Sequence, residues 1–119
     1  MSILKRIRMH IPRRIQEVQR TMVILINRFT LTASPEKFEE VFEKTAVFMR
    51  SQPGFIRHTL VKSLRDPSIY VNIAHWEDAA DHIRSLQHPE FADHITALAE
   101  VATPDPDLYS IAQDVARAG

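Results

Sequence analysis

Cysteine is absent from this chain, which excludes disulfide bonds, thiolate metal sites and a cysteine nucleophile, and fits a reducing compartment. Glycine is scarce, and seven prolines against two glycines argue against a flexible, low-complexity chain. No apolar run approaches the roughly 18 residues that a membrane-spanning helix needs. Arg6, Arg8 and His10 interrupt the first apolar stretch, so we expect no cleavable signal peptide and a cytoplasmic protein. What is present, 119 residues of which 45% are apolar, suits one compact domain.

A net charge of one sign is also lacking, because fifteen basic and fifteen acidic residues cancel, yet the two signs are unevenly distributed. Residues 1–20 carry six basic residues and one acidic residue, a balance of +5. Residues 21–119 carry nine basic and fourteen acidic residues, a balance of −5. The two segments therefore differ in kind. We expect a basic amphipathic N-terminal extension at 1–20 and one folded domain at 21–119.

The N-terminal extension repeats isoleucine at every fourth position, as on one face of a helix: Ile3, Ile7, Ile11 and Ile15. Pro12 would kink or break that helix. The segment could be an arm that binds a membrane surface or a nucleic acid. It is explained more simply as a helix that packs on the protein's own dimer, as a solvated tail, or by translation that starts at Met22. No nucleic-acid partner is therefore expected.

The rest of the chain alternates between patterns typical of strands and of helices. The expected elements are a strand over 22–31, a helix that starts at Ser34-Pro35 and ends at 52–54, strands over 55–64 and 69–76, a helical region that opens at Glu77-Asp78 and is interrupted at His88-Pro89, and a strand over 108–115. Residues 103–106, Thr-Pro-Asp-Pro, are expected to break the chain before the last strand.

The order β-α-β-β-α-β predicts an α+β, ferredoxin-like fold, with a four-stranded antiparallel sheet and its helices on one face. The other face of such a sheet must be covered. A second copy of the chain is the economical cover, so we expect a homodimer. The N-terminal extension is an alternative cover for part of that face.

Three stretches carry a resemblance to a known family. They are Asn-Arg-Phe-Thr-Leu at 27–31, Gln-Pro-Gly-Phe at 52–55, and Tyr-Val-Asn-Ile-Ala-His-Trp-Glu at 70–77, the last followed by His-Pro-Glu-Phe at 88–91. In this order the chain resembles the antibiotic biosynthesis monooxygenase (ABM) family of the dimeric α+β barrel superfamily. The resemblance implies a homodimer with a small-molecule pocket between each sheet and its helices.

Asn72 and Trp76 match positions that the cofactor-independent, anthrone-oxidising members of this family use. The resemblance therefore implies oxidation of a planar phenolic or quinonoid, polyketide-like substrate by O₂, with no cofactor. Asn72 can donate hydrogen bonds to an oxyanion, and Trp76 can stack and donate its indole N–H. A pocket tyrosine of that branch falls at His82, which is a candidate acid or base, and a pocket arginine falls near Thr96. Tyr70 shares a strand face with Asn72, so we expect it to line the pocket wall. Asn27 and His94 are further candidates for substrate binding.

Haem degradation, in another branch of the superfamily, is a second hypothesis. Asn27 matches the asparagine of that branch, and His94 falls close to its axial histidine. The aromatic residue that would distort the porphyrin falls near Ser85 in this chain. A serine cannot replace it, and this mismatch argues against haem degradation.

A dimer that binds a small hydrophobic molecule without catalysis is a third hypothesis. In it Trp76 is a core anchor, Asn72 a satisfied amide and His82 a solvent-facing helical residue. The later histidines follow one another at intervals of six or seven residues, which does not place them on one ligand face, so no metal site is expected.

Overall fold

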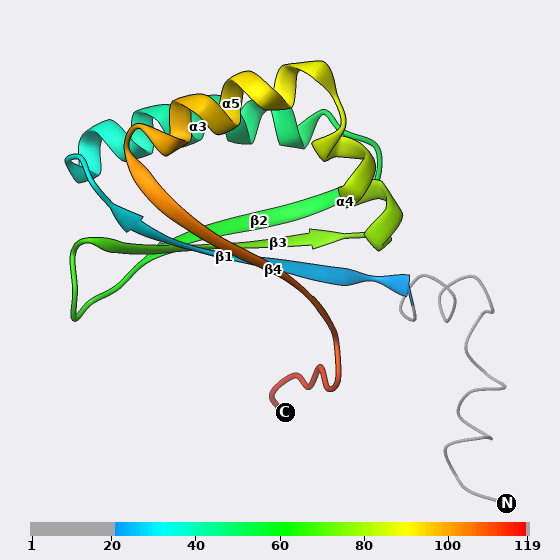
Figure 1. The fold of residues 1–119 in the computed structure, drawn as a ribbon. Coiled ribbons are helices and arrows are strands. Elements are labelled where there is room, and N and C mark those ends of the chain that lie inside the picture. Colours follow the sequence, from blue (N-terminus) through cyan, green and yellow to red (C-terminus); the bar gives the residue numbers. More distant parts are fainter. Residues whose placement is uncertain (1–20, 119) are drawn as a thin grey trace, which may run out of the picture.

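The computed structural model describes residues 21–118 (Figure 1). The predicted N-terminal extension at 1–20 therefore lies outside the described residues. The elements follow in the order β1 (Val23–Leu31), α3 (Pro35–Arg50), β2 (Phe55–Lys62), β3 (Ile69–Trp76), α4 (Ala79–Leu86), α5 (Pro89–Ala99) and β4 (Ala102–Ser110).

The four strands form one antiparallel sheet in the order β2-β3-β1-β4, and α3, α4 and α5 lie together on one of its faces (Figure 1). The predicted ferredoxin-like fold is confirmed. None of the helices within residues 21–118 is long and apolar enough to cross a membrane.

Helix starts occur where the sequence predicts them. Ser34 caps α3 by accepting a hydrogen bond from the backbone N–H of Lys37 at 3.2 Å. Asp78 caps α4 in the same way through the N–H of Ala80. The interruption at His88 separates α4 from α5. The His88 ring caps α5, and Pro89 occupies the first turn of α5.

The turn between α3 and β2 depends on Gly54, whose φ of 87° lies in the left-handed region. Its carbonyl oxygen accepts a hydrogen bond from the N–H of Glu77 at 2.8 Å, which ties this turn to the end of β3. A Cβ atom on residue 54 would collide with the side chain of Asp81. The turn and the start of α4 are therefore held closely together.

The last strand corrects the sequence-based prediction. The predicted break at 103–106 is wrong, because these residues lie within β4, which ends at Ser110 rather than at Val115. β4 is an edge strand, so one of its flanks has no neighbouring strand in the sheet. Prolines are tolerated at such an edge because the N–H they lack is not needed on the open flank. Pro104 and Pro106 pair with Phe29 and Asn27 of β1.

The core between sheet and helices has two parts. The larger part is an aromatic cluster in which the ring of Phe38 lies 5.1 Å from Phe29 and 4.9 Å from Tyr70. The smaller part is built on Trp76, which is fully buried against Leu25 and Ala74. A cavity lies between the sheet and the helices and reaches both parts.

The opposite face of the sheet carries the alternate residues of the same strands. On β1 and β3 this face holds half-buried apolar residues, with Arg28, Thr30 and His75 beside them: Ile24, Ile26, Ile69, Val71 and Ile73. In the part of the chain that the structure describes, no helix covers this face (Figure 1).

Candidate active site

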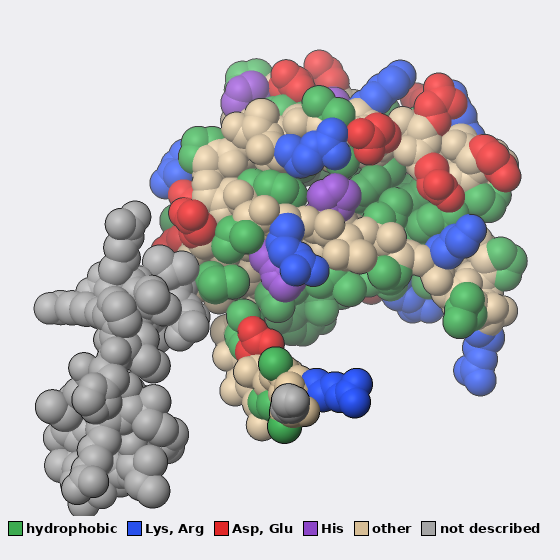
Figure 2. Space-filling model, turned by 180° about the vertical axis from the view of Figure 1, so that it is seen from behind, with side chains coloured by type: hydrophobic (Ala, Val, Ile, Leu, Met, Phe, Trp, Pro, Cys, Tyr) green, Lys and Arg blue, Asp and Glu red, His purple; other side chains and the backbone are tan. Residues whose placement is uncertain are grey.

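The cavity has a volume of about 450 Å³ and a mostly apolar wall. Its floor is the sheet and its roof is formed by α3, α4 and α5; the lining residues are Leu25, Asn27, Phe29, Phe42, Thr45, Ala46, Met49, Phe55, His58, Asn72, Ala74, Trp76, His82, Leu86, Phe91, Ile95, Leu98, Pro104, Pro106, Asp107 and Leu108. A slot of this size and composition suits a small aromatic molecule. Figure 2 shows acidic side chains over the helix layer and hydrophobic side chains beneath it.

The two asparagines of the chain lie side by side on the floor of the cavity. Asn27 and Asn72 are direct cross-strand partners in the pairing of β1 with β3. Such partners have Cβ atoms about 4.5–5.5 Å apart. The strand alternation inferred from sequence therefore places both carboxamides correctly on the cavity face.

Each carboxamide is held by its oxygen. Asn27 Oδ1 accepts a hydrogen bond from the backbone N–H of Asp105 at 3.0 Å. Asn72 Oδ1 lies 3.2 Å from Nδ1 of His58. Neither NH₂ group has a partner among the described residues. Since a carboxamide NH₂ offers two donors, the cavity floor can present two amide donors to an oxygen atom of a ligand.

Trp76 and His82 form the end wall of the cavity. Trp76 is 0% exposed, and its ring meets the rings of Phe55 and His82 edge-on at 5.4 and 5.3 Å. Burial lowers the pKa of His82, so its imidazole is neutral at pH 7. The ordinary expectation of a solvent-facing His82 is wrong, since only 5% of this residue is exposed.

Three buried polar atoms of the lining have no hydrogen-bond partner within residues 21–118: Thr45 Oγ1, Trp76 Nε1 and His82 Nδ1. A buried polar group without a partner costs about 1–3 kcal/mol. Groups of this kind are retained in proteins mainly where water, an ion or a ligand uses them. All three atoms belong to residues that line the cavity, Thr45 in its roof and Trp76 and His82 in its end wall.

Tyr70 lies on the predicted strand face but does not line the cavity. Its ring is buried in the aromatic cluster, and its hydroxyl donates to Glu39 at 2.5 Å. That hydrogen bond, followed by burial, raises the pKa of Tyr70 to about 12. Phe29, its cross-strand partner, lines the cavity instead. The expectation that Tyr70 forms part of the pocket wall is not met, because this end of the slot is filled by aromatic rings.

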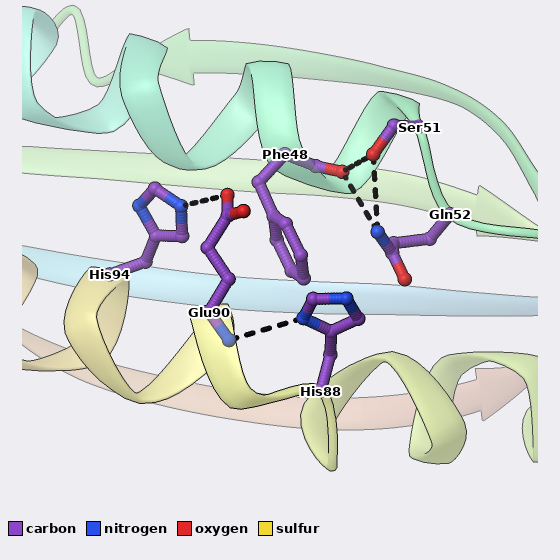
Figure 3. A network of polar contacts seen from close by, with 6 residues as sticks. All are labelled: Phe48, Ser51, Gln52, His88, Glu90 and His94. Atoms are coloured by element: carbon purple, nitrogen blue, oxygen red, sulfur yellow. Dashed lines mark hydrogen bonds and ion pairs between the residues drawn. The ribbon is translucent and has the colours of Figure 1, made fainter.

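His94 also lies outside the cavity lining. Figure 3 shows its ring beside Phe48, with a centroid separation of 5.2 Å, and its Nε2 3.0 Å from the Glu90 carboxylate. The cavity-lining residues of α5 are Phe91, Ile95 and Leu98. His94 follows Phe91 by three residues and precedes Leu98 by four, so it lies near these residues on the helix surface, but its ring packs against Phe48 of α3 instead of lining the cavity. The predicted haem ligand is therefore not placed to bind iron in this cavity.

Sequence reasoning missed His58 and Thr45. His58 lies two residues before Leu60, and Leu60 is the cross-strand partner of Asn72. The register of the β2–β3 hairpin was the signal that would have found His58. Thr45 sits at helical spacing among the phenylalanines of α3, a pattern that indicates packing and not a polar site.

The titratable groups of the cavity wall are His58, His82 and Asp107, and the lining includes neither lysine nor arginine. In the described part of the chain, no group of three or more potential ligands is placed to hold a metal ion. The site thus offers amide donors, an indole and two imidazoles in an apolar slot.

Comparison with known proteins agrees with this arrangement. The family model described as antibiotic biosynthesis monooxygenase matches residues 22–97. Deoxynogalonate monooxygenase from Streptomyces nogalater is 41% identical over 97 residues, which cover 82% of this chain and 82% of that enzyme. The crystal structure of SnoaB, a cofactor-independent oxygenase from the same organism, is 40% identical, has a TM-score of 0.78, and covers 82% of this chain and 99% of that one.

A protein of Deinococcus radiodurans resembles this chain in fold alone, with 20% identity and a TM-score of 0.68 over 82% of this chain and 99% of that one. The family match, by contrast, extends over most of the chain and includes both asparagines and Trp76. This chain is a member of the antibiotic biosynthesis monooxygenase family.

Proposed function

We propose that this protein is a cofactor-independent monooxygenase that oxidises a planar phenolic or quinonoid, polyketide-like molecule with O₂. The observation that carries the proposal is the apolar slot whose floor holds two asparagine NH₂ groups without partners among the described residues. The similarity to a relative described as a cofactor-independent oxygenase supports the same chemistry.

This chemistry requires an apolar slot that fits the substrate, an acceptor for one substrate proton, and hydrogen-bond donors for the substrate oxygen. An aromatic ring system lies in the apolar slot, and loss of one proton converts it into an electron-rich anion. Donors aimed at its oxygen stabilise the negative charge, as in other sites that bind oxyanions. The anion then reduces O₂. In the overall reaction a methylene group and O₂ give a carbonyl group and water, so the substrate itself supplies the electrons.

In this proposal Asn27 and Asn72 donate to the substrate oxygen, and Trp76 forms the aromatic end wall.

O₂ uptake tests the proposal directly. The purified protein is mixed with 1,8-dihydroxyanthrone in a chelator-containing buffer without flavin, and the product is analysed by mass spectrometry in ¹⁸O₂. We expect one labelled oxygen atom in a carbonyl product. Asn72→Ala should lower the rate at least tenfold, while Gln87→Ala, which removes an exposed carboxamide on the C-cap of α4, should leave it unchanged.

Binding of the anthrone without O₂ uptake above the uncatalysed rate would instead support the non-catalytic binding protein. Equal rates for wild type and Asn72→Ala would contradict the assignment of the asparagines. A haem titration followed at the Soret band is the matching test of the haem hypothesis.

We further propose that the protein is a homodimer whose subunits pair through the open face of the sheet. This face carries an apolar patch on its two central strands, β1 and β3, formed by the half-buried side chains of Ile24, Ile26, Val71 and Ile73. Apolar patches of this kind mark interfaces. Light scattering should give twice the mass of 13.7 kDa, and Ile73→Glu should shift the protein toward the monomer. A monomer at all concentrations would contradict the proposal.

A further inference from the structure

His58 is a histidine of the cavity wall that the proposed function leaves without a role. It lies on β2, is half-buried, and its ring centroid is 5.9 Å from that of Phe42 and 6.0 Å from that of Phe55. These two phenylalanines also line the cavity. His58 therefore faces the space in which an aromatic substrate would lie.

The contact with Asn72 fixes which nitrogen of His58 carries a proton. Asn72 Oδ1 lies 3.2 Å from His58 Nδ1, and a carboxamide oxygen only accepts hydrogen bonds. Nδ1 must therefore be the donor. In the neutral ring the proton then resides on Nδ1, and Nε2 carries the free lone pair. No described residue forms a hydrogen bond with Nε2.

The same contact orients Asn72. Because its oxygen is turned toward His58, its NH₂ group is left to donate elsewhere in the cavity. One pair of side chains thus provides both an acceptor for a proton and a donor for the oxygen on which charge develops. An imidazole held through Nδ1–H by a carbonyl oxygen, with Nε2 free, is the arrangement expected of a general base.

We propose that His58 is a catalytic residue, the base whose Nε2 removes the substrate proton, and that Asn72 holds it in the required tautomer. The inference rests on the proposed oxidation of a phenolic substrate. The Nε2 lone pair forms an N–H bond, the O–H or C–H bond of the substrate breaks, and its electron pair stays on the substrate as the anion. After O₂ has been reduced, the imidazolium returns the proton to the oxygen that leaves as water.

The other titratable groups of the wall are less suited to this step. His82 on α4 has no partner for its buried Nδ1 within the described chain, so no hydrogen bond at Nδ1 fixes its tautomer or stabilises an imidazolium. Burial also lowers the pKa of His82 and makes it a weaker base. Asp107 lies on the exposed edge strand β4. The lining residues contributed by α3, α5, β1 and β3 include no titratable group.

Two measurements on the full-length protein test His58. The first is the rate of O₂ uptake with 1,8-dihydroxyanthrone. His58→Gln retains an amide donor near Asn72 but is not a base, and should lower kcat about 100-fold or more. His94→Gln, a histidine outside the cavity, is the matched control and should leave kcat unchanged. His58→Ala should regain part of the lost rate when imidazole is added to the buffer.

The second measurement needs no turnover. Alizarin (1,2-dihydroxyanthraquinone) absorbs at longer wavelength when it ionises, so its protonation state can be read while it is bound. An imidazolium beside the anion favours ionisation. We expect the ionisation of bound alizarin to move upward by about one pH unit or more in His58→Gln, with no change in His94→Gln. Circular dichroism checks that each variant is folded.

These outcomes distinguish a failure of the His58 proposal from a failure of the proposed monooxygenase activity. A kcat of His58→Gln within threefold of wild type, or a larger loss in His82→Gln than in His58→Gln, would overturn the role of His58 while oxidation stands. A His58-dependent shift of alizarin without O₂ uptake by wild type would support His58 as proton acceptor and reject the monooxygenase. Absence of both effects would reject both proposals.

Discussion

Replacing Thr45 with valine should make the empty protein more stable. Thr45 lies on α3 with 7% of its surface exposed, and its Oγ1 is buried without a partner among residues 21–118. A helical threonine commonly satisfies its hydroxyl through the carbonyl oxygen four residues earlier. Thr96 on α5 does this, donating to the carbonyl oxygen of Ala92 at 3.0 Å, whereas Thr45 does not.

The expected gain in stability follows from the unsatisfied hydroxyl of Thr45. Valine has nearly the shape of threonine, so the exchange removes an unsatisfied hydroxyl and creates no cavity. Leaving a buried polar group unpaired costs about 1–3 kcal/mol, and the helix propensities of the two residues are similar. We therefore expect Thr45→Val to raise the free energy of unfolding by about 1 kcal/mol. For a domain of this size that raises the melting temperature by about 4–8 °C.

Urea unfolding followed by circular dichroism measures the change, with all variants at one protein concentration because a dimer's stability depends on it. Thr96→Val is the matched control. It removes a satisfied, exposed hydroxyl and should change stability by no more than about 0.5 kcal/mol. A loss of stability in Thr45→Val would refute the reasoning, since it would mean that the hydroxyl is hydrogen-bonded in solution.

Three further expectations concern the frame around the site. Gly54→Ala should destabilise the protein by about 1–3 kcal/mol in urea unfolding, because φ is 87° and the new Cβ would meet Asp81; an unchanged midpoint would contradict this. The pKa of Tyr70 is raised from 10.0 to about 12 by Glu39, so the unfolded chain ionises first as pH rises. The stabilisation that Tyr70 contributes is therefore complete below pH 10 and is lost as the pH rises toward 12. When unfolding is measured against pH, the free energy of unfolding of Tyr70→Phe should change less over that window than that of the wild type. Phe48→Ala should cost about 3–5 kcal/mol, because the ring is 4% exposed, and a cost below about 1 kcal/mol would show that this packing contributes little.

Much of the fold could be predicted from local sequence signals. The Ser34-Pro35 and His88-Pro89 pairs mark helix starts correctly, because capping depends on a few consecutive residues. The error at β4 has a non-local cause. Residues 103–106 are poor strand formers by themselves, and their place at the sheet edge, beside β1, is what makes Pro104 and Pro106 acceptable.

The sequence by itself determined which residues face the helices, because side chains on a strand alternate with a period of two. That rule placed Asn27 and Asn72 on the cavity floor, and it also put Tyr70 on the same face. Only the tertiary structure decided how far the cavity extends along that face. Aromatic packing around Phe38 encloses Tyr70, and packing against Phe48 keeps the His94 ring out of the cavity lining. His58 meets Asn72 through the register of β2 with β3, a pairing between residues fourteen positions apart. Alternation is a property of each strand, whereas packing and register arise only when strands and helices meet.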